Sequence, residues 1–122
     1  MKKILIIEDD PVAGYVYRTR LQKEGYEVQV AIDAESVLER LAEFRPDALL
    51  LDLMLPKTSG IDLLKMIRQQ GLKLPVIAFT NAFVPGMIEG ARQAGATLVL
   101  DKLTMTPGTL ADALRGSFLA AT

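Results

Sequence analysis

The sequence contains no cysteine and no histidine among its 122 residues. Without cysteine, the chain can form no disulfide bond, no thiolate zinc site and no cysteine nucleophile. Without histidine, it can form no Ser-His-Asp triad, no imidazole metal site and no phosphohistidine of its own. Any chemistry that the chain performs must therefore use carboxylates, hydroxyls or amines.

The sequence also lacks long apolar runs and an excess of charge of either sign. The apolar run Ile4–Ile7 is shorter than the ~7–15-residue apolar region of a signal peptide. The longest charge-free stretch, residues 74–88, contains two prolines and is shorter than the ~20 apolar residues of a membrane helix. The 14 Lys and Arg residues nearly balance the 15 Asp and Glu residues, so no positive field attracts nucleic acid or anionic membranes. We therefore expect a cytoplasmic protein without direct nucleic-acid or membrane binding.

The chain length is that of one folded domain, because domains cluster near about 100 to 150 residues. Hydrophobic residues make up 50% of the chain, which supplies the material for a buried core. We predict a single domain over residues 1–122.

Five short apolar runs have the length of β-strands and are rich in Ile, Val and Leu. They do not alternate strictly with polar residues, which is typical of strands that are covered on both faces. The runs are Ile4–Ile7, Val28–Ile32, Ala48–Leu51, Val76–Phe79 and Thr97–Leu100.

The segments between these runs carry signals that start and stop helices. Capping residues and prolines open them, and glycines or a proline close them. Strands and helices that alternate with short connections predict a doubly wound α/β domain, a parallel sheet with helices on both faces. The predicted helices run from Asp10 to Gly25, from Asp33 to Pro46, from Ser59 to Gly71, from Pro85 to Gly95, and onward from Thr106 or Pro107.

Functional residues in such a sheet lie past the carboxyl ends of the strands. We interpret Asp10 as the N-cap of the helix that starts at Pro11. Five other polar residues end or follow the predicted strands, and we expect them to lie at one edge of the sheet. They are Glu8, Asp9, Asp52, Thr80 and Lys102.

Asp52 stands between apolar residues, where an ionised group is costly unless it has a partner. A salt bridge to Lys102 is one such partner and implies no further function. Three converging carboxylates, however, repel one another, and a bound divalent cation relieves that repulsion. Oxygen ligands without His or Cys favour Mg²⁺. Glu8, Asp9 and Asp52 are therefore candidate magnesium ligands.

Thr80 and Lys102 fit phosphoryl chemistry at Asp52. A carboxylate can act as a nucleophile and become an aspartyl phosphate, while a metal ion and an ammonium group offset the charge on the transferring group. The Thr80 hydroxyl could donate to a phosphoryl oxygen, although a hydroxyl at a strand end more often caps the backbone.

Over essentially its whole length, the sequence resembles the receiver domains of two-component response regulators, the chemotaxis-regulator-like family. The resemblance rests on the order and spacing of several short motifs, each of which is weak alone. They are Glu8-Asp9 after Ile4–Ile7, Pro56 and Gly60 four and eight residues after Asp52, Pro75-Val76 before Thr80, and Ala94-Gly95-Ala96 before Lys102.

The resemblance implies a flavodoxin-like, five-stranded parallel sheet of order 2-1-3-4-5 with five helices. It also implies that Asp52 is the phosphoacceptor in a phosphorelay and that Thr80 and Lys102 contact the phosphoryl group. Asp9 would bind Mg²⁺ directly, Glu8 would bind it through water, and the backbone carbonyl of Met54 would be the remaining protein ligand.

The partners that the resemblance implies are proteins. A histidine kinase or a histidine phosphotransfer protein would supply the phosphoryl group. A downstream protein would bind the face formed by the helix from Pro85, the strand Thr97–Leu100 and the last helix.

Three positions differ from the usual pattern of receivers. Asn81 stands where a small residue usually follows the hydroxyl, and Val99 stands where an aromatic residue is common. Leu103 replaces a proline that commonly follows the lysine with a cis peptide bond. Because a cis bond before a non-proline residue costs about 2.5–4 kcal/mol, we expect a trans bond and a different loop there. These changes bear on signal output more than on acceptor chemistry.

Other α/β functions fit the sequence less well. The acidic residues after the first strand would repel the phosphate of a flavodoxin-type cofactor, and no Gly-x-Gly-x-x-Gly motif follows that strand. A phosphatase of the haloacid-dehalogenase type needs a second Asp where this chain has Met54. The sequence thus predicts a phosphorylatable signalling domain, not an ordinary turnover enzyme. The alternative is a receiver-like interaction module that is not phosphorylated in the cell.

Overall fold

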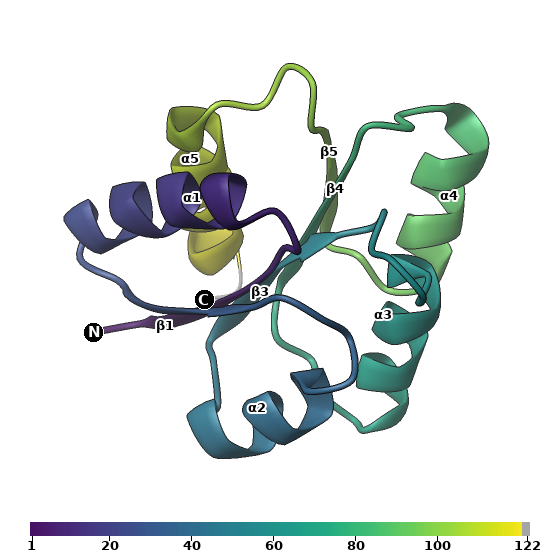
Figure 1. The fold of residues 1–122 in the computed structure, drawn as a ribbon, viewed down its shortest axis with the longest axis horizontal. Coiled ribbons are helices and arrows are strands. Elements are labelled where there is room, and N and C mark those ends of the chain that lie inside the picture. The colour runs from purple at the N-terminus through teal and green to yellow at the C-terminus, as the bar shows by residue number, and fades with distance from the viewer. Residues whose placement is uncertain (121–122) are drawn as a thin grey trace.

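A computed structural model describes residues 1–120, in which five strands alternate with five helices (Figure 1). The predicted domain also includes residues 121–122, which lie outside this range. The strands are β1 (Lys3–Ile7), β2 (Glu27–Ala31), β3 (Ala48–Asp52), β4 (Val76–Thr80) and β5 (Leu98–Asp101). The helices are α1 (Pro11–Lys23), α2 (Val37–Phe44), α3 (Gly60–Gln69), α4 (Pro85–Gln93) and α5 (Pro107–Ala120).

The strands form one parallel sheet of order β2-β1-β3-β4-β5, as predicted. The register pairs Ile7 of β1 with Leu51 of β3, and Thr80 of β4 with Asp101 of β5. All strands therefore end at the same edge of the sheet, where the residues that follow them meet.

Helices cover both faces of the sheet and create two hydrophobic cores. Helices α1 and α5 lie side by side over one face, and α2, α3 and α4 cover the other (Figure 1). Successive residues of a strand point to opposite faces. In β1, Ile4 and Ile6 accordingly pack toward α1 and α5, whereas Leu5 and Ile7 belong to the core under the other three helices.

The two edge strands are less covered than the uniform apolar runs predicted. β1, β3 and β4 lie in the middle of the sheet and are almost wholly buried, whereas β2 and β5 are largely half-buried. Leu98, the first residue of β5, has 39% of its surface exposed. An edge strand has a neighbour on one side only, which leaves its side chains partly open to solvent.

Most helix boundaries agree with the sequence signals, and one does not. The carboxylate of Asp10 accepts from the Val12 amide at 3.0 Å, so the predicted N-cap of α1 is confirmed. The predicted start of the second helix at Asp33 is wrong, because α2 begins at Val37. The carboxylate of Asp33 instead accepts from the amide and the hydroxyl of Ser36 and closes a turn before the helix.

None of the helices in the described part of the chain combines the length and hydrophobicity that a membrane crossing requires.

Candidate functional site

The polar residues predicted to converge do meet at the carboxyl edge of the sheet. Glu8 follows β1, Asp52 ends β3, Thr80 ends β4 and Lys102 follows β5. Glu8 and Thr80 are 0% exposed and Asp52 is 2% exposed. Within residues 1–120, these three are the only buried residues with polar or charged side chains. Burying polar groups is costly, so their concentration at one place marks this edge as the candidate site.

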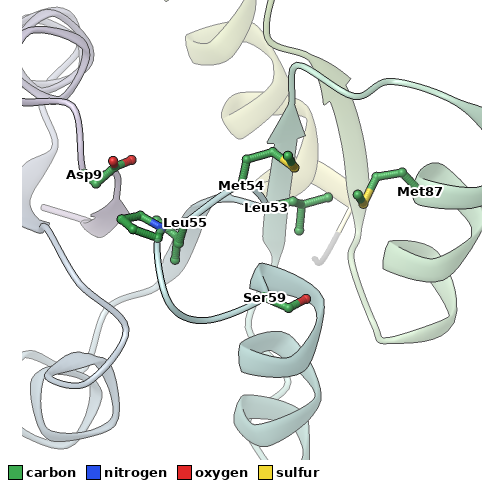
Figure 2. A pocket seen from close by; sticks show the side chains of 7 residues that line it. Asp9, Leu53, Met54, Leu55, Ser59 and Met87 are labelled. Atoms are coloured by element: carbon green, nitrogen blue, oxygen red, sulfur yellow. The ribbon is translucent and has the colours of Figure 1, made fainter.

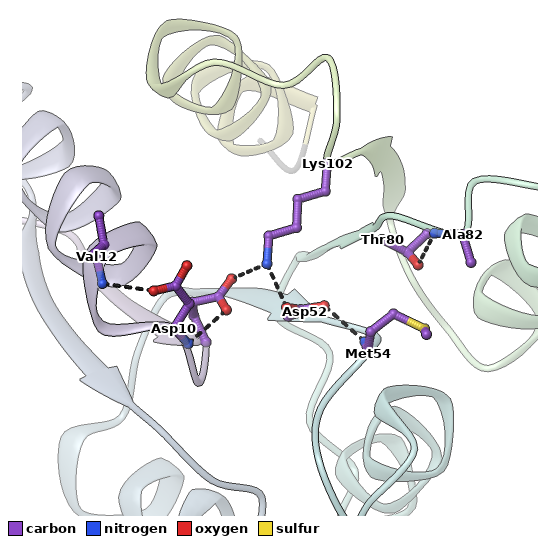
Figure 3. Close-up of polar contacts among 8 residues, drawn as sticks. Asp10, Val12, Asp52, Met54, Thr80, Ala82 and Lys102 are labelled. Atoms are coloured by element: carbon purple, nitrogen blue, oxygen red, sulfur yellow. Dashed lines mark hydrogen bonds and ion pairs between the residues drawn. The ribbon is translucent and has the colours of Figure 1, made fainter.

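The ammonium group of Lys102 bridges the two buried carboxylates (Figure 3). Its Nζ donates to Oε2 of Glu8 and to Oδ2 of Asp52, each at 2.8 Å. The backbone satisfies the second oxygen of each carboxylate: the Asp10 amide donates to Glu8 Oε1 at 3.1 Å, and the Met54 amide donates to Asp52 Oδ1 at 2.8 Å. The salt bridge between Asp52 and Lys102 is therefore present, and Glu8 extends it to a triad.

The electrostatics of the triad favour a charged lysine. Burial raises the pKa of Glu8, and the nearby charge of Asp52 raises it further, while hydrogen bonds from Lys102 and the Asp10 amide partly oppose these effects. Burial alone would lower the pKa of Lys102, but its hydrogen bonds to Asp52 and Glu8 outweigh burial and raise the pKa. The site thus holds a permanent positive charge between its carboxylates near neutral pH.

Asp9 completes a cluster of three carboxylates. Glu8, Asp9 and Asp52 each offer one oxygen, and these oxygens lie within 4.8 Å of one another. Asp9 is exposed, whereas the other two are buried. An all-oxygen set with one accessible carboxylate fits the requirements of Mg²⁺, which keeps several waters and takes few protein ligands. The donor set therefore fits the predicted metal.

An open groove of about 460 Å³ reaches this cluster. Figure 2 shows Asp9 on one side of the groove and Met87 of α4 on the other, with Leu53 and Met54 between them. Leu55, Pro56 and Ser59 complete the lining. The groove gives a molecule in solvent access to Asp9, the exposed carboxylate of the cluster.

Thr80 and Met54 lie where the sequence places them, although their functional roles stay predictions. The Thr80 hydroxyl oxygen accepts from the Ala82 amide at 3.0 Å, so in this structure it caps the backbone. Met54 contacts Asp52 through its amide, and 50% of its surface is exposed beside the groove. Neither arrangement prevents the contacts that the family resemblance implies.

Two of the three departures from the usual receiver pattern lie at this edge, whereas Val99 lies inside β5. Asn81 is exposed directly after Thr80, and Val99 is partly buried against the core under α4. Leu103 is 76% exposed, and its amide donates to the Asp101 carboxylate at 3.0 Å. Among the described residues every peptide bond is trans, so the expected trans bond before Leu103 is confirmed.

Sequence analysis missed one neighbour of the site, Phe79. Its ring is fully buried, and Lys102 Nζ lies 5.7 Å from the ring centroid. An aromatic residue inside an apolar strand looks like ordinary core, so the sequence carries no signal for this contact.

Comparisons with known proteins agree with this geometry. The response regulator receiver domain family matches residues 4–115. PhoP of Bacillus subtilis, an alkaline phosphatase synthesis transcriptional regulatory protein, is 38% identical over 79 residues, which are 65% of this chain and 33% of PhoP. The chain thus spans about a third of the length of the curated relatives that it matches.

Solved structures show the same likeness in three dimensions. The beryllofluoride-activated N-terminal receiver domain of Klebsiella pneumoniae RstA is 31% identical, with a TM-score of 0.87 over 93% of this chain and 96% of that one. The chemotaxis response regulator CheY4 of Vibrio cholerae is 28% identical, with a TM-score of 0.88 over 96% and 98% of the two chains. The chain belongs to the response regulator receiver domain family, the signalling modules of two-component systems.

Proposed function

We propose that this receiver, as one domain over residues 1–122, accepts a phosphoryl group on Asp52 from the phosphohistidine of a partner, with Mg²⁺ held by Glu8, Asp9, Asp52 and the Met54 carbonyl. The supporting observation is the charge balance of the buried triad. A salt bridge that only stabilises the core needs one carboxylate for one ammonium, whereas here Lys102 faces two buried carboxylates, with Asp9 beside them. Excess buried negative charge is costly, which favours a site built to receive a cation.

The proposed transfer uses the residues in distinct ways. An oxygen of Asp52 forms a bond to phosphorus while the bond from phosphorus to the imidazole nitrogen breaks and its electron pair stays with the imidazole. Bound Mg²⁺ would neutralise charge on the phosphoryl oxygens. Lys102 would exchange its bond to Asp52 for one to a phosphoryl oxygen. Thr80 Oγ1 already accepts a hydrogen bond from Ala82, so the hydroxyl hydrogen can be donated to the phosphoryl group.

The phosphodonor would dock on the carboxyl edge of the sheet. Every segment that follows a strand at this edge carries at least one exposed apolar side chain. These side chains are Val12, Ile32, Met54, Phe83, Val84 and Leu103. Apolar residues that rim a polar site are typical of a protein interface. They support a protein donor, a histidine kinase or a histidine phosphotransfer protein. A downstream partner would bind the separate face of α4, β5 and α5.

Replacing the acceptor tests the proposal. We expect the parent protein, given acetyl phosphate and Mg²⁺, to gain one phosphate by mass spectrometry and to lose this reactivity with EDTA. Asp52→Asn removes the nucleophile and should abolish the modification. The matched control, Asp62→Asn, changes an exposed carboxylate at the start of α3 and should leave it intact. A phosphate that persists in Asp52→Asn would move the acceptor elsewhere.

A receiver-like interaction module without phosphorylation is the second candidate. The position of Asn81 beside Thr80 and the exposed Leu103 beside Lys102 favour it, because both alter the surroundings of the acceptor. A parent protein that gains no phosphate under the same conditions would support this candidate.

A further inference from the structure

Phe79 lies between the candidate acceptor and the lysine in the sheet. The register pairs Phe79 of β4 with Asp52 of β3 on one side and with Leu100 of β5 on the other. Lys102 follows Leu100 by two residues and reaches back over the ring, with Nζ 5.7 Å from the centroid. The ring thus belongs to β4, and the ammonium belongs to the residue directly after the neighbouring strand β5.

The contact has the geometry of a cation–π interaction. An ammonium group within about 6 Å of a ring centroid is attracted by the negative ring face, and the attraction grows when water is excluded. Phe79 is 0% exposed and the Lys102 side chain is 17% exposed. The ammonium therefore has three anionic or electron-rich neighbours, which are Glu8, Asp52 and the ring of Phe79.

A second aromatic residue fixes the orientation of the ring. Tyr17 of α1 packs against Phe79 with the ring centroids 5.9 Å apart and the planes at 70°. Aromatic pairs prefer this edge-to-face arrangement, which adds about 0.5–1.5 kcal/mol to the stabilisation from burial. Both residues belong to the core under α1 and α5, on the face of the sheet opposite to Val99. The aromatic residues near Lys102 thus come from β4 and α1, because β5 contains no aromatic residue.

We propose that Phe79 is a positioning residue whose ring holds the Lys102 ammonium between Glu8 and Asp52, with Tyr17 bracing the ring. Lysine has a long, flexible side chain, and two carboxylates alone leave it free to move along the site. The ring limits this movement and keeps the ammonium where a phosphoryl group on Asp52 would be bound. The predicted effect of Phe79 on the phosphorylation rate rests on the proposed function. The predicted position of the Lys102 ammonium over the ring does not.

Nuclear magnetic resonance of the metal-free protein tests the positioning directly. Protons above an aromatic ring are shifted upfield, so the Hε resonances of Lys102, assigned by their loss in Lys102→Met, should lie upfield of those of the other lysines. Phe79→Leu keeps an apolar side chain but removes the ring, and should return these resonances to ordinary values. Leu114→Ala, the control, removes apolar volume from the same core and should leave them shifted.

Kinetics then separate positioning from stability. The rate of phosphorylation by acetyl phosphate at saturating Mg²⁺ should fall roughly 3- to 10-fold in Phe79→Leu and remain near the parental value in Leu114→Ala. Unchanged Lys102 resonances in Phe79→Leu, or equal slowing in Leu114→Ala, would show that the ring only fills the core.

A second variant tests the positioning if Phe79→Leu does not fold. Tyr17→Leu keeps the Phe79 ring but removes the aromatic residue that packs against it, and should weaken the upfield shift. An unaltered shift counts against the proposal. A parent protein that takes no phosphate would refute the proposed function, while the resonances would still decide on positioning.

Discussion

Replacing Lys102 should affect Mg²⁺ binding and phosphorylation in different ways. Removing the ammonium in Lys102→Met makes the acidic cluster more negative, so Mg²⁺ should bind at least as tightly as in the parent. Phosphorylation should slow, on the order of 100-fold, because the ammonium that would offset the negative charge of the phosphoryl group is lost. Calorimetric titration with Mg²⁺ and rates with acetyl phosphate measure the two effects.

Lys65→Met, which changes a lysine on the exposed side of α3, is the matched control for both measurements. If Lys102→Met binds Mg²⁺ much more weakly than the control does, the lysine supports the fold of the pocket and not its chemistry.

We expect Met54 and Ala82 to determine how long an aspartyl phosphate at Asp52 lasts. The family resemblance places them beside the path of the water that hydrolyses the phosphate, and neither side chain can hydrogen-bond that water. Met54 is half exposed beside the groove and can cover the phosphoryl group. We expect a long-lived phosphate in the parent and a loss several-fold faster in the double variant Met54→Asn with Ala82→Glu.

Acid-quenched decay of the phosphorylated protein gives both lifetimes. Equal lifetimes would mean that water positioning at these residues is not limiting, and Asn81 would be the next residue to change.

Among the secondary-structure elements, the end of α4 is held by a side chain of α3. Arg68 donates from Nε and Nη2 to the carbonyl of Gly95 at 3.1 and 2.7 Å, and from Nη1 to the carbonyls of Leu72 and Leu74 at 2.9 and 2.8 Å. One guanidinium thus joins the turn between α4 and β5 to the turn between α3 and β4.

Gly95→Ala should therefore destabilise the protein by about 1–3 kcal/mol. Gly95 has φ +113°, which side chains rarely adopt, and an added Cβ would lie 2.8 Å from Cγ and Nε of Arg68. Gly116→Ala, at an exposed position in α5 with open space around it, should instead be neutral or stabilising. Urea unfolding followed by circular dichroism compares the two, and equal stabilities would contradict the tight packing at Gly95.

The elements themselves could be predicted because local signals and packing agree. All five strands and the helices starting at Pro11, Gly60, Pro85 and Pro107 lie within a residue or two of the predicted positions. The second helix could not be bounded correctly, since Asp33 can cap either a turn or a helix, and only tertiary packing selects the turn. The apolar composition of β2 and β5 did not reveal their partial exposure, and only the sheet order implied by the family resemblance places these two strands at the edges.

At the scale of the whole molecule, a change at Asp52 would have to alter the structure as far as the face of α4, β5 and α5. We expect beryllofluoride to change NMR chemical shifts from Asp52 through Thr80 to Val99, as partner binding on α4, β5 and α5 requires. Shifts that change only around Glu8, Asp9 and Asp52 would mean that Val99 has uncoupled this face. That outcome would favour the interaction-module reading.

The sequence also predicted that the polar residues after the strands converge, since parallel strands bring their carboxyl ends together. Glu8, Asp52 and Lys102 meet within hydrogen-bond distance, and Asp9 lies beside them. The bond of Lys102 to Glu8 and its contact with Phe79 could not be predicted. They depend on how one flexible side chain crosses the sheet, which no spacing in the sequence specifies.

The triad joins parts of the chain that are synthesised far apart in time. Lys102 follows Asp52 by 50 residues and Glu8 by 94, and it comes after the last strand. A nascent chain that has emerged only as far as β4 would hold these two carboxylates without their ammonium, which is costly when they are buried and no cation is bound. We therefore expect the salt-bridged triad to form only after β5 has docked, with Lys102 as the last of its three residues to take its place.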